Sequence, residues 1–360
     1  MRLMELALTL GRRSLGRTWP NPAVGAVVVN HGLIVGRGWT QPGGRPHAET
    51  EALARAGEAA RGATLYVTLE PCSHYGRTPP CADAIVSAGI ARVVSALVDP
   101  NSSVAGAGHW RLAEQGIVVE VGIGADEARH IHAGHIRRMR DGRPHVMLKL
   151  AVSADDKVAL SGRRPAAITG ARSRNRVHLM RSMHDAVLTG IGTVLADDPV
   201  LTCRLPGMHS PVRIVLDASL RLSPKCRLVA SVGQAPLWVV ADEGAASDRE
   251  QALKAMGVEV FRVESSNGRL DLHAMFRLLA ERGITRVMVE AGPVLATAMI
   301  RADLVDEAAL FRAPTVIGNG GIDALDGEPI SALTQSSQLR RIATESVGTD
   351  TLELLERPLS

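Results

Sequence analysis

The chain has 360 residues, of which 46% are apolar and 22% are charged, so it is long enough for two globular domains with separate cores. Its net charge of +4 favours a small anionic ligand such as a phosphate ester. The absence of a dense Lys/Arg run and an aromatic content of 2% argue against nucleic acid as a partner. Four cysteines are too few for a disulfide scaffold and predict a cytoplasmic location, and no apolar run is long enough to predict a membrane span.

The first part of the chain predicts alternating helices and strands. A helix is expected over the first dozen residues, followed by a hairpin whose strands are VGAVVV and the residues around Leu33–Val35. A second helix follows His47 and ends at Gly62 or before. The next elements are a strand at 64–69, a helix at 81–89, and strands at 91–98 and 117–122. This alternation predicts an α/β sandwich with a mixed sheet.

A basic, polar segment at 130–144 ends in Gly-Arg-Pro and predicts a domain boundary, with one domain at 1–143 and another at 144–360. The second domain is also expected to be α/β. Helices are predicted at 171–185 and 271–283, and the strand at 185–192 is expected to enter a glycine turn. The other predicted strands are 146–153, 212–217, 237–240, 258–263 and 286–290.

A metal site is predicted from PHAE at 46–49 and EPCSHYGRTPPC at 70–81. A His-x-Glu motif followed by Pro-Cys and a second cysteine is typical of zinc-dependent deaminases. His47, Cys72 and Cys81 would bind Zn²⁺ and leave a fourth position for water, whose pKa falls to about 7 on zinc. Glu49 lies close enough to accept the water's proton and deliver it to the ring and to the leaving amine.

The spacing of the two cysteines leaves an alternative open. Most such deaminases have Cys-x₂-Cys, whereas eight residues separate Cys72 from Cys81 here. The pair could instead belong to a closed zinc knuckle, for which His74 could supply a fourth ligand, or be buried free thiols.

Longer stretches resemble a known family. TWPNPAVGAVVV at 18–29, PHAETEAL at 46–53 and TLEPCSHYGRTPPC at 68–81 are similar to the bifunctional riboflavin-biosynthesis deaminase/reductases, whose cysteines have this eight-residue gap. The second half of the chain also resembles this family, in KLAVS at 149–153, LTGIGTVLADDPVLTCR at 188–204 and VEAG at 289–292. The resemblance implies a cytidine-deaminase-like three-layer α/β/α domain followed by a dihydrofolate-reductase-like α/β domain that uses NADPH.

The resemblance also implies two reactions on a phosphorylated pyrimidine. In the first, 2,5-diamino-6-(5-phosphoribosylamino)pyrimidin-4(3H)-one loses its 2-amino group by hydrolysis, and in the second the ribosyl chain is reduced to ribityl by NADPH. Asn21, His74 and Arg77 fall on positions that hold the substrate of the deaminase. The expected reductase residues comprise the cofactor positions Ala151, Thr193, Asp197 and Gly292, the substrate positions Arg181, Leu201, Arg204 and Glu290, and Lys149 as a further candidate.

The second half departs from the family pattern at several positions. Asp156 stands where most members have glycine, Pro165 and Ala167 replace a serine and a tryptophan, and Ala291 replaces a glycine. In the first half, Ala26 stands where many members have cysteine, which is not a ligand position. These changes are expected to reflect a reshaped pocket, with a weakened reductase as the alternative.

Two other functions remain to be weighed. One is a deaminase whose C-terminal domain is structural or catalytically weak, and the other is a zinc-stabilised nucleic-acid-binding module. The second of these would need basic stripes, exposed aromatic residues and a closed metal site. We also expect a homodimer, a small-molecule substrate and no membrane partner.

Overall fold

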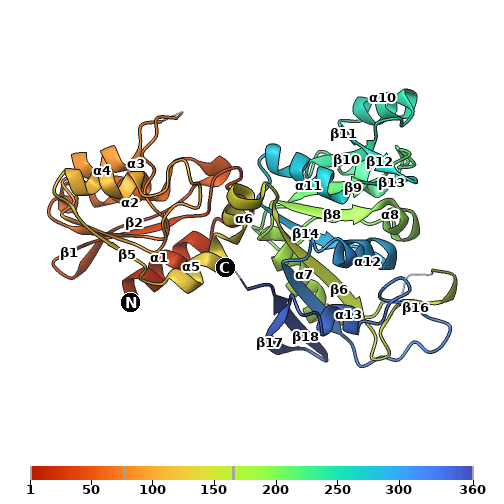
Figure 1. Cartoon of the computed structure of the whole chain (residues 1–360). Helices are drawn as coiled ribbons and strands as arrows, with labels where there is room; N and C mark the ends of the chain where they lie inside the picture. Colours follow the sequence, from red (N-terminus) through yellow and green to blue (C-terminus); the bar gives the residue numbers. More distant parts are fainter. Residues whose placement is uncertain (1, 77, 164–166, 359–360) are drawn as a thin grey trace. The chain divides into compact units, whose positions relative to one another are not determined.

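The computed structural model describes residues 2–76, 78–163 and 167–358. Residues 2–144 together with 280–285 form one compact unit, and most of the remaining residues form a second (Figure 1). Within the described residues no helix is long and apolar enough to cross a membrane.

The first unit is a five-stranded mixed sheet with the strand order β2-β1-β3-β4-β5, in which β1 is antiparallel to its neighbours β2 and β3 and the other pairs are parallel. The mixed sheet predicted from the sequence is therefore confirmed. The strands are β1 Gly25–Asn30, β2 Leu33–Trp39, β3 Thr64–Val67, β4 Arg92–Ser95 and β5 Val118–Val121. The helices are α1 Arg2–Arg12, α2 Ala48–Ala56, α3 Cys81–Ser87, α4 Ala107–Glu114, α5 Ala125–Ile131 and α6 Ala133–Asp141, with 3-10 turns at Pro42–Gly44 and Gly57–Ala60.

Helices cover both faces of this sheet, which gives the three expected layers. Helix α2 packs on β1 and β2 and contacts α3, which in turn contacts α4, whereas α1 packs on β1 and contacts α5 (Figure 1). The alternation along β1 explains the arrangement. Ala26 and Val28 join the core beneath α2, and Gly25 faces α1 so closely that a Cβ there would lie 1.9 Å from the Ala7 carbonyl oxygen.

Helix α2 approaches β2 with similar closeness. A Cβ on Gly36 would lie 2.1 Å from the Ala52 carbonyl oxygen, and one on Gly38 would lie 2.1 Å from the Ala48 carbonyl oxygen. Both glycines point toward the helix because residues two apart on a strand share a face. Only glycine permits this contact, which fixes the start of α2 above the sheet.

The second unit is a nine-stranded sheet with the order β11-β10-β9-β8-β14-β6-β15-β18-β17. All pairs from β11 to β15 are parallel, and the pairs that include β18 are antiparallel. Its strands are β6 His145–Val152, β8 Ala186–Gly190, β9 Val212–Leu216, β10 Leu237–Asp242, β11 Glu259–Val263, β14 Arg286–Glu290, β15 Glu307–Arg312, β17 Arg340–Val347 and β18 Asp350–Glu356. Short pairs form between β7 Lys157–Ala159 and β16 Ile322–Asp323, and between β12 Ser265–Ser266 and β13 Arg269–Leu270.

One face of the large sheet packs on four helices. Met147, Val187, Val215, Val239 and Met288 lie on that face in a single core with residues of α7 to α10. The helices of this unit are α7 Ala171–Ser182, α8 Ile191–Asp197, α9 Arg227–Ala230, α10 Ser247–Ala255, α11 Leu272–Glu281, α12 Pro293–Arg301 and α13 Ser331–Thr334, with a 3-10 turn at Ser161–Arg163.

One expectation from the sequence is wrong. The residues after β8 do not form a glycine turn, because Gly190 is the N-cap of helix α8. The segment 130–144, predicted as a domain boundary, is largely helical and lies mostly in α6. Strands β15, β17 and β18 were not predicted, although the two-residue turn between β17 and β18 begins at Gly348, whose φ of +71° suits a tight hairpin.

Candidate functional site

Three side chains that could hold a metal ion meet near the starts of two helices in the first unit. His47 is the N-cap of α2, Cys81 is the first residue of α3, and Cys72 lies in the loop that follows β3. The Nδ1 atom of His47 lies 3.3 Å from Cys81 Sγ and 3.7 Å from Cys72 Sγ. The ligand atoms of all three residues lie within 4.8 Å of one another.

This geometry fits a tetrahedral zinc ion. With usual Zn–N and Zn–S bond lengths, nitrogen and sulfur ligands of one ion are about 3.6 Å apart. The observed separations of 3.3 and 3.7 Å bracket that value. In the part of the chain that the structure describes, His74 does not belong to the donor cluster, so the closed site with four protein ligands is not formed. Three ligands and one open position are typical of a catalytic zinc.

The protonation of the cluster follows from its hydrogen bonds. A hydrogen bond from the Cys81 thiol, with help from His47, lowers the pKa of Cys72 to about 4, and the same bond raises the pKa of Cys81. The backbone N–H of Cys81 also donates to Cys72 Sγ, at 3.3 Å. The pKa of His47 is raised chiefly by its hydrogen bond with Cys72, while the charge of Arg45 opposes that shift.

Glu49 is the second residue of α2, with only 3% of its surface exposed. Burial raises the pKa of its carboxyl to about 6, although the charge of His47 opposes the shift. A carboxyl group whose pKa lies near neutral pH can both accept and donate a proton during a reaction. Its placement is therefore suited to general acid–base chemistry beside the metal ligands.

Two of the predicted substrate residues lie on loops around this cluster. Asn21 donates a hydrogen bond from its side-chain amide to the Gly44 carbonyl oxygen at 2.8 Å, in the loop that leads to His47. His74 is exposed on the loop between the two cysteines, and its charge helps to lower the pKa of Asp99 after a larger effect of His135, against the opposing effect of burial. Arg77 lies outside the described residues.

Glu70, directly before Pro71 and Cys72, was missed in the sequence. Its buried carboxylate accepts hydrogen bonds at 2.8–2.9 Å from the backbone N–H groups of Asp99, Gly106 and Gly108. A Cβ on Gly108 would lie 1.9 Å from the Pro71 carbonyl oxygen. The loop before α4 is thus held tightly against the cysteine-bearing segment. The sequence feature that could have identified Glu70 is its position directly before Pro71 and the predicted ligand Cys72.

Three further side chains hold the loop between the two cysteines. Arg111 donates to the Ser73 carbonyl oxygen at 3.3 Å and forms an ion pair with Asp83 at 2.5 Å. Tyr75 donates to the same Asp83 carboxylate at 2.9 Å. Helices α3 and α4 therefore both contribute to the position of this loop.

A second cluster lies at the carboxyl ends of adjacent parallel strands in the second unit. Strands β8, β14 and β6 are neighbours, and the carboxyl edge of such a sheet is where α/β proteins bind ligands. Glu290 ends β14 and pairs in register with Lys149 on β6. The two side chains therefore lie at neighbouring positions near the carboxyl edge of the sheet.

Arg181 and Glu290 form a buried, two-pronged ion pair at this edge. The Nε and Nη2 atoms of Arg181 lie 2.5 and 3.0 Å from the two carboxylate oxygens of Glu290, and Arg181 also donates to the Thr202 carbonyl oxygen at 2.9 Å. Burial alone would raise the pKa of Glu290, but the charge and hydrogen bonds of Arg181 lower it to about 2. Burial lowers the pKa of Lys149, and Glu290 opposes that shift.

The remaining predicted substrate residues lie near this pair. The backbone N–H of Arg204 is 3.4 Å from His178 Nδ1, and after burial the charges of Arg181 and Arg204 help to lower the pKa of His178. Leu201 is buried with a φ of +58°, a strained conformation for a leucine. The segment 201–204 thus brings the charge of Arg204 close enough to act on His178, one helical turn from Arg181.

The predicted cofactor residues flank two helix starts. Gly190 and Gly292 are the N-caps of α8 and α12, and neither helix has a side-chain cap for its first N–H groups. A Cβ on Gly292 would lie 3.4 Å from Thr193 Oγ1, which brings the two helix starts together. Ala151 lies near the end of β6, and Asp197 is exposed at the last turn of α8.

The departures from the family pattern are accommodated locally. Asp156 has a φ of +62°, which explains why glycine suits the position, and its carboxylate pairs with Arg312 at the end of β15. The added negative charge is therefore compensated. Ala291 has no positive φ, so alanine fits there without strain. Ala167 is exposed, and Pro165 lies outside the described residues.

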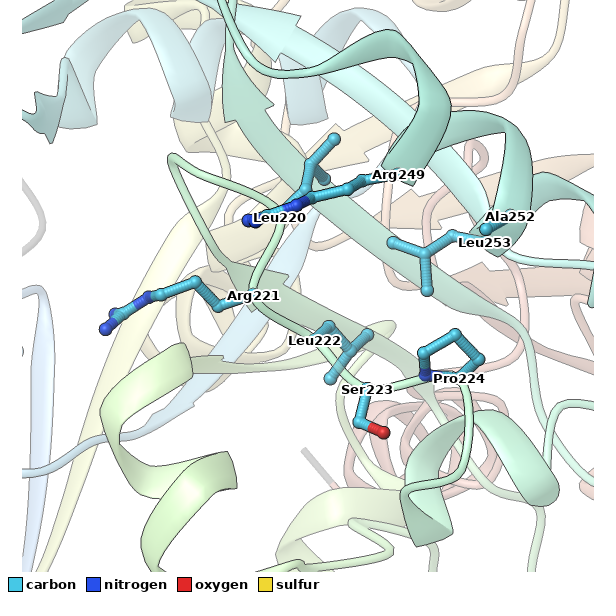
Figure 2. Close-up of a pocket in the computed structure, with 8 residues that line it drawn as sticks. All are labelled: Leu220, Arg221, Leu222, Ser223, Pro224, Arg249, Ala252 and Leu253. Atoms are coloured by element: carbon cyan, nitrogen blue, oxygen red, sulfur yellow. The ribbon is translucent and has the colours of Figure 1, made fainter.

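A pocket of about 390 Å³ opens at the same edge of the sheet, where β9 and β10 end. Its walls are the loop that follows β9 and one side of α10. In Figure 2, Arg221 from the loop and Arg249 from α10 extend away from the apolar side chains of Pro224 and Leu253. The pocket thus combines an apolar wall with two cationic groups, and sequence reasoning did not find it.

Comparison with known proteins identifies both units. Residues 1–97 match the model of the cytidine and deoxycytidylate deaminase zinc-binding region, and residues 144–352 match the RibD C-terminal domain. The predicted fold class, with a cytidine-deaminase-like and a dihydrofolate-reductase-like domain, is confirmed by these matches and by the two sheets.

Full-length relatives match as well. The riboflavin biosynthesis protein RibD of Escherichia coli is 40% identical over 96% of both chains, and that of Aquifex aeolicus is 40% identical over 98% of this chain and 97% of its own. The solved structure of Acinetobacter baumannii RibD superposes with a TM-score of 0.88 at 35% identity, covering 99% of this chain and 98% of its own. A Thermotoga maritima deaminase/reductase gives a TM-score of 0.85 at 34% identity, with the same coverage.

We predict that Arg181→Met destabilises the second unit by about 3–5 kcal/mol at pH 8, because it leaves Glu290 buried without its partner. The native pKa of Glu290, about 2, lies below its ordinary 4.5, so the pair stabilises the fold above pH 4.5 and loses this effect as the pH falls toward 2. In the variant the unpaired carboxyl should instead have a raised pKa. The loss of unfolding free energy in Arg181→Met should therefore be smaller at pH 5 than at pH 8.

Urea unfolding at both pH values measures this effect. Arg176→Met is the matched control, because Arg176 lies on the same helix and its pair with Glu345 is exposed at 37% and 42%. The free energy of unfolding of Arg176→Met should fall by less than about 1 kcal/mol. Equal losses in the two variants, or a deficit that does not depend on pH, would contradict the assigned role of the pair.

Proposed function

Because the chain belongs to the RibD family of bifunctional riboflavin-biosynthesis deaminase/reductases, we propose that it deaminates 2,5-diamino-6-(5-phosphoribosylamino)pyrimidin-4(3H)-one and then reduces the ribosyl chain of the product to ribityl. The observation that carries the proposal is the pairing of an open His/Cys/Cys cluster beside Glu49 with a separate cationic site in the second unit. The enzyme uses Zn²⁺ and NADPH. The chain carries a reductase domain as well as the deaminase domain, which favours the bifunctional reading over a deaminase alone.

In the deaminase site, we assign His47, Cys72 and Cys81 as ligands of Zn²⁺, which when bound supplies Lewis-acid activation of a water molecule. Glu49 would accept the two protons of the attacking water in turn, passing one to the ring nitrogen and the other to the departing amine, which leaves as ammonia. Its buried position and its pKa of about 6 support both transfers. The amide of Asn21, held by Gly44, would pair with the edge of the pyrimidine.

In the deaminase site, His74 and Arg77 would bind the substrate's phosphate, and in the reductase site Arg204 would do so. Glu290 holds Arg181 in place, and Arg181 would also contact the substrate. Leu201, whose strained backbone lies beside Thr202, would shape the wall of the reductase site. The burial of Arg181 and Glu290 keeps these contacts rigid before the substrate arrives.

NADPH, when bound, supplies the hydride for the reduction. The first N–H groups of α8 and α12 lack side-chain caps and would bind its pyrophosphate, with Thr193 and Gly292 at the point where the two helix starts meet. Ala151, Asp197 and Lys149 would line the rest of the site. Strand β9 is adjacent to β8 in the sheet, and the loop that follows β9 forms one wall of the pocket.

We assign that pocket to the adenosine end of the cofactor. Pro224 and Leu253 offer an apolar wall to the base, while Arg221 and Arg249 offer two cations to the additional phosphate that distinguishes NADPH from NADH. Arg249 donates to the Ser219 carbonyl oxygen at 3.1 Å, which leaves other guanidinium N–H groups to bind phosphate.

The proposal also covers the domain boundary, the cellular location and the oligomeric state. The boundary between the deaminase and reductase domains is proposed at residues 143/144, and its support is the division of the chain next to Pro144, although residues 280–285 group with the first unit. A cytoplasmic location is supported by four unpaired cysteines. A homodimer is proposed from the resemblance alone.

We predict that the two reactions can be silenced separately. Glu49→Ala should reduce ammonia release from the diamino substrate by at least about 10²-fold, because it removes the proton-transferring group. The same variant should still oxidise NADPH when the deaminated intermediate is supplied. Arg204→Ala should show the reverse pattern. Loss of both activities in either variant would contradict two independent active sites.

We also predict that Arg221→Ala and Arg249→Ala each raise the KM for NADPH by about 10-fold, the effect expected for one charge-assisted contact to phosphate. The KM for NADH should change little, because that cofactor lacks the additional phosphate. Steady-state rates with both cofactors measure the difference. Parallel changes for NADPH and NADH would assign the pocket to another role.

A further inference from the structure

Arg45 carries a positive charge into the loop between the two metal-binding cysteines. It lies two residues before His47, and its Nη1 atom donates a hydrogen bond to the Thr78 hydroxyl. Its Nη2 atom is 3.4 Å from the position that a Cβ on Gly76 would occupy. The half-buried side chain therefore reaches from the segment before α2 to the loop that carries His74.

This charge has no acidic partner. Within the described ranges no carboxylate forms an ion pair with the half-buried Arg45. The carboxylates on the surrounding elements are already engaged, Glu51 with Arg55, Asp83 with Arg111 and Asp99 with His135. A half-buried guanidinium that is held in place without a carboxylate is a typical binding group for an external anion.

We propose that Arg45 is an additional phosphate-binding residue of the deaminase site, a role that rests on the proposed function. The Thr78 hydroxyl occupies one of the five guanidinium N–H groups, so a planar fork remains for two parallel bonds to a phosphate. The Thr78 hydroxyl accepts from Arg45 and can donate its own proton to the same anion. Arg45 thus selects the phosphorylated pyrimidine over its unphosphorylated form.

Two other roles for Arg45 give different results. If it only tethers the loop 76–78, its loss affects every substrate equally. If it only offsets the negative charge of the two cysteine sulfurs, its loss lowers the zinc content. A phosphate-binding residue instead changes the preference between two substrates that differ by the phosphate.

The experiment compares ammonia release by the full chain and by Arg45→Gln and Arg45→Lys. The substrates are the phosphorylated diaminopyrimidine and its dephosphorylated form. For Arg45→Gln we expect the KM for the phosphorylated substrate to rise by about 10- to 100-fold, the loss expected for a charge-assisted bidentate contact. The kcat/KM for the dephosphorylated form should change by less than about two-fold, with zinc content unchanged. The KM of Arg45→Lys for the phosphorylated substrate should lie between those of the unchanged chain and of Arg45→Gln, because lysine keeps the positive charge but lacks the planar guanidinium fork.

Arg129→Gln is the matched control, because Arg129 is an exposed arginine on α5 that pairs only with the fully exposed Asp126. It makes the same change in net charge and should leave both substrates unaffected. Equal loss on both substrates in Arg45→Gln, a fall in zinc content, or an unchanged KM for the phosphorylated substrate would each overturn the inference.

The proposed function and this inference fail in distinguishable ways. No ammonia release by the unchanged chain from the phosphorylated substrate would refute the proposed deamination. In that event the rise in melting temperature caused by inorganic phosphate still tests Arg45. A smaller rise in Arg45→Gln than in the unchanged chain and in Arg129→Gln supports the anion site, and equal rises in all three overturn it.

Discussion

The deaminase site depends on the close contact between helix α2 and strand β2. Gly36 and Gly38 allow the helix backbone to pack directly on the strand backbone. A Cβ on either glycine would lie only 2.1 Å from a carbonyl oxygen of the helix, which is too close for any other residue. This contact fixes the start of α2, and with it both His47 and Glu49. The cysteines reach the same point from α3 and from the loop after β3. A metal site assembled from three distant segments needs such rigid supports, because a ligand displaced by 1 Å no longer coordinates.

The second unit uses a different device for the same purpose. A parallel sheet brings the ends of β8, β14 and β6 to one edge, and the buried Arg181–Glu290 pair fixes the polar groups there. Buried ion pairs are costly to desolvate and contribute little net stability, so their value lies in position. Arg181 also holds the Thr202 carbonyl oxygen, which links the pair to the segment that ends in Arg204. The site is therefore organised before any ligand binds.

Much of this arrangement could be predicted from the sequence. The β1–β2 hairpin, helix α2 and the strands β3, β8 and β14 follow from hydrophobic periodicity. The proposed zinc ligands and the proposed acid–base residue Glu49 follow from the chemistry of His, Cys and Glu at their spacing. Strand β17 was missed because it is largely exposed and its sequence has no clear alternation of apolar and polar residues. Helix α8 was missed because it is short and starts at a glycine that also signals a turn.

Other site features depend on contacts that sequence alone does not reveal. Glu70 and Arg45 act through loops that approach only in the folded chain. The pocket beside Arg221 needs both β9 and α10 to be in place. Asp156 illustrates the reverse case, because the sequence correctly raised the issue of a positive φ but could not show that Arg312 compensates its charge.

The most direct test of the account is removal of zinc from the intact protein. We expect a chelator to abolish ammonia release, to leave the chain folded by circular dichroism, and to leave NADPH oxidation with the deaminated intermediate unchanged, with added Zn²⁺ restoring the first activity. This result would place the metal in an open catalytic site formed by His47, Cys72 and Cys81. Ammonia release by the zinc-free protein, or unfolding of the first unit when zinc is removed, would contradict that claim.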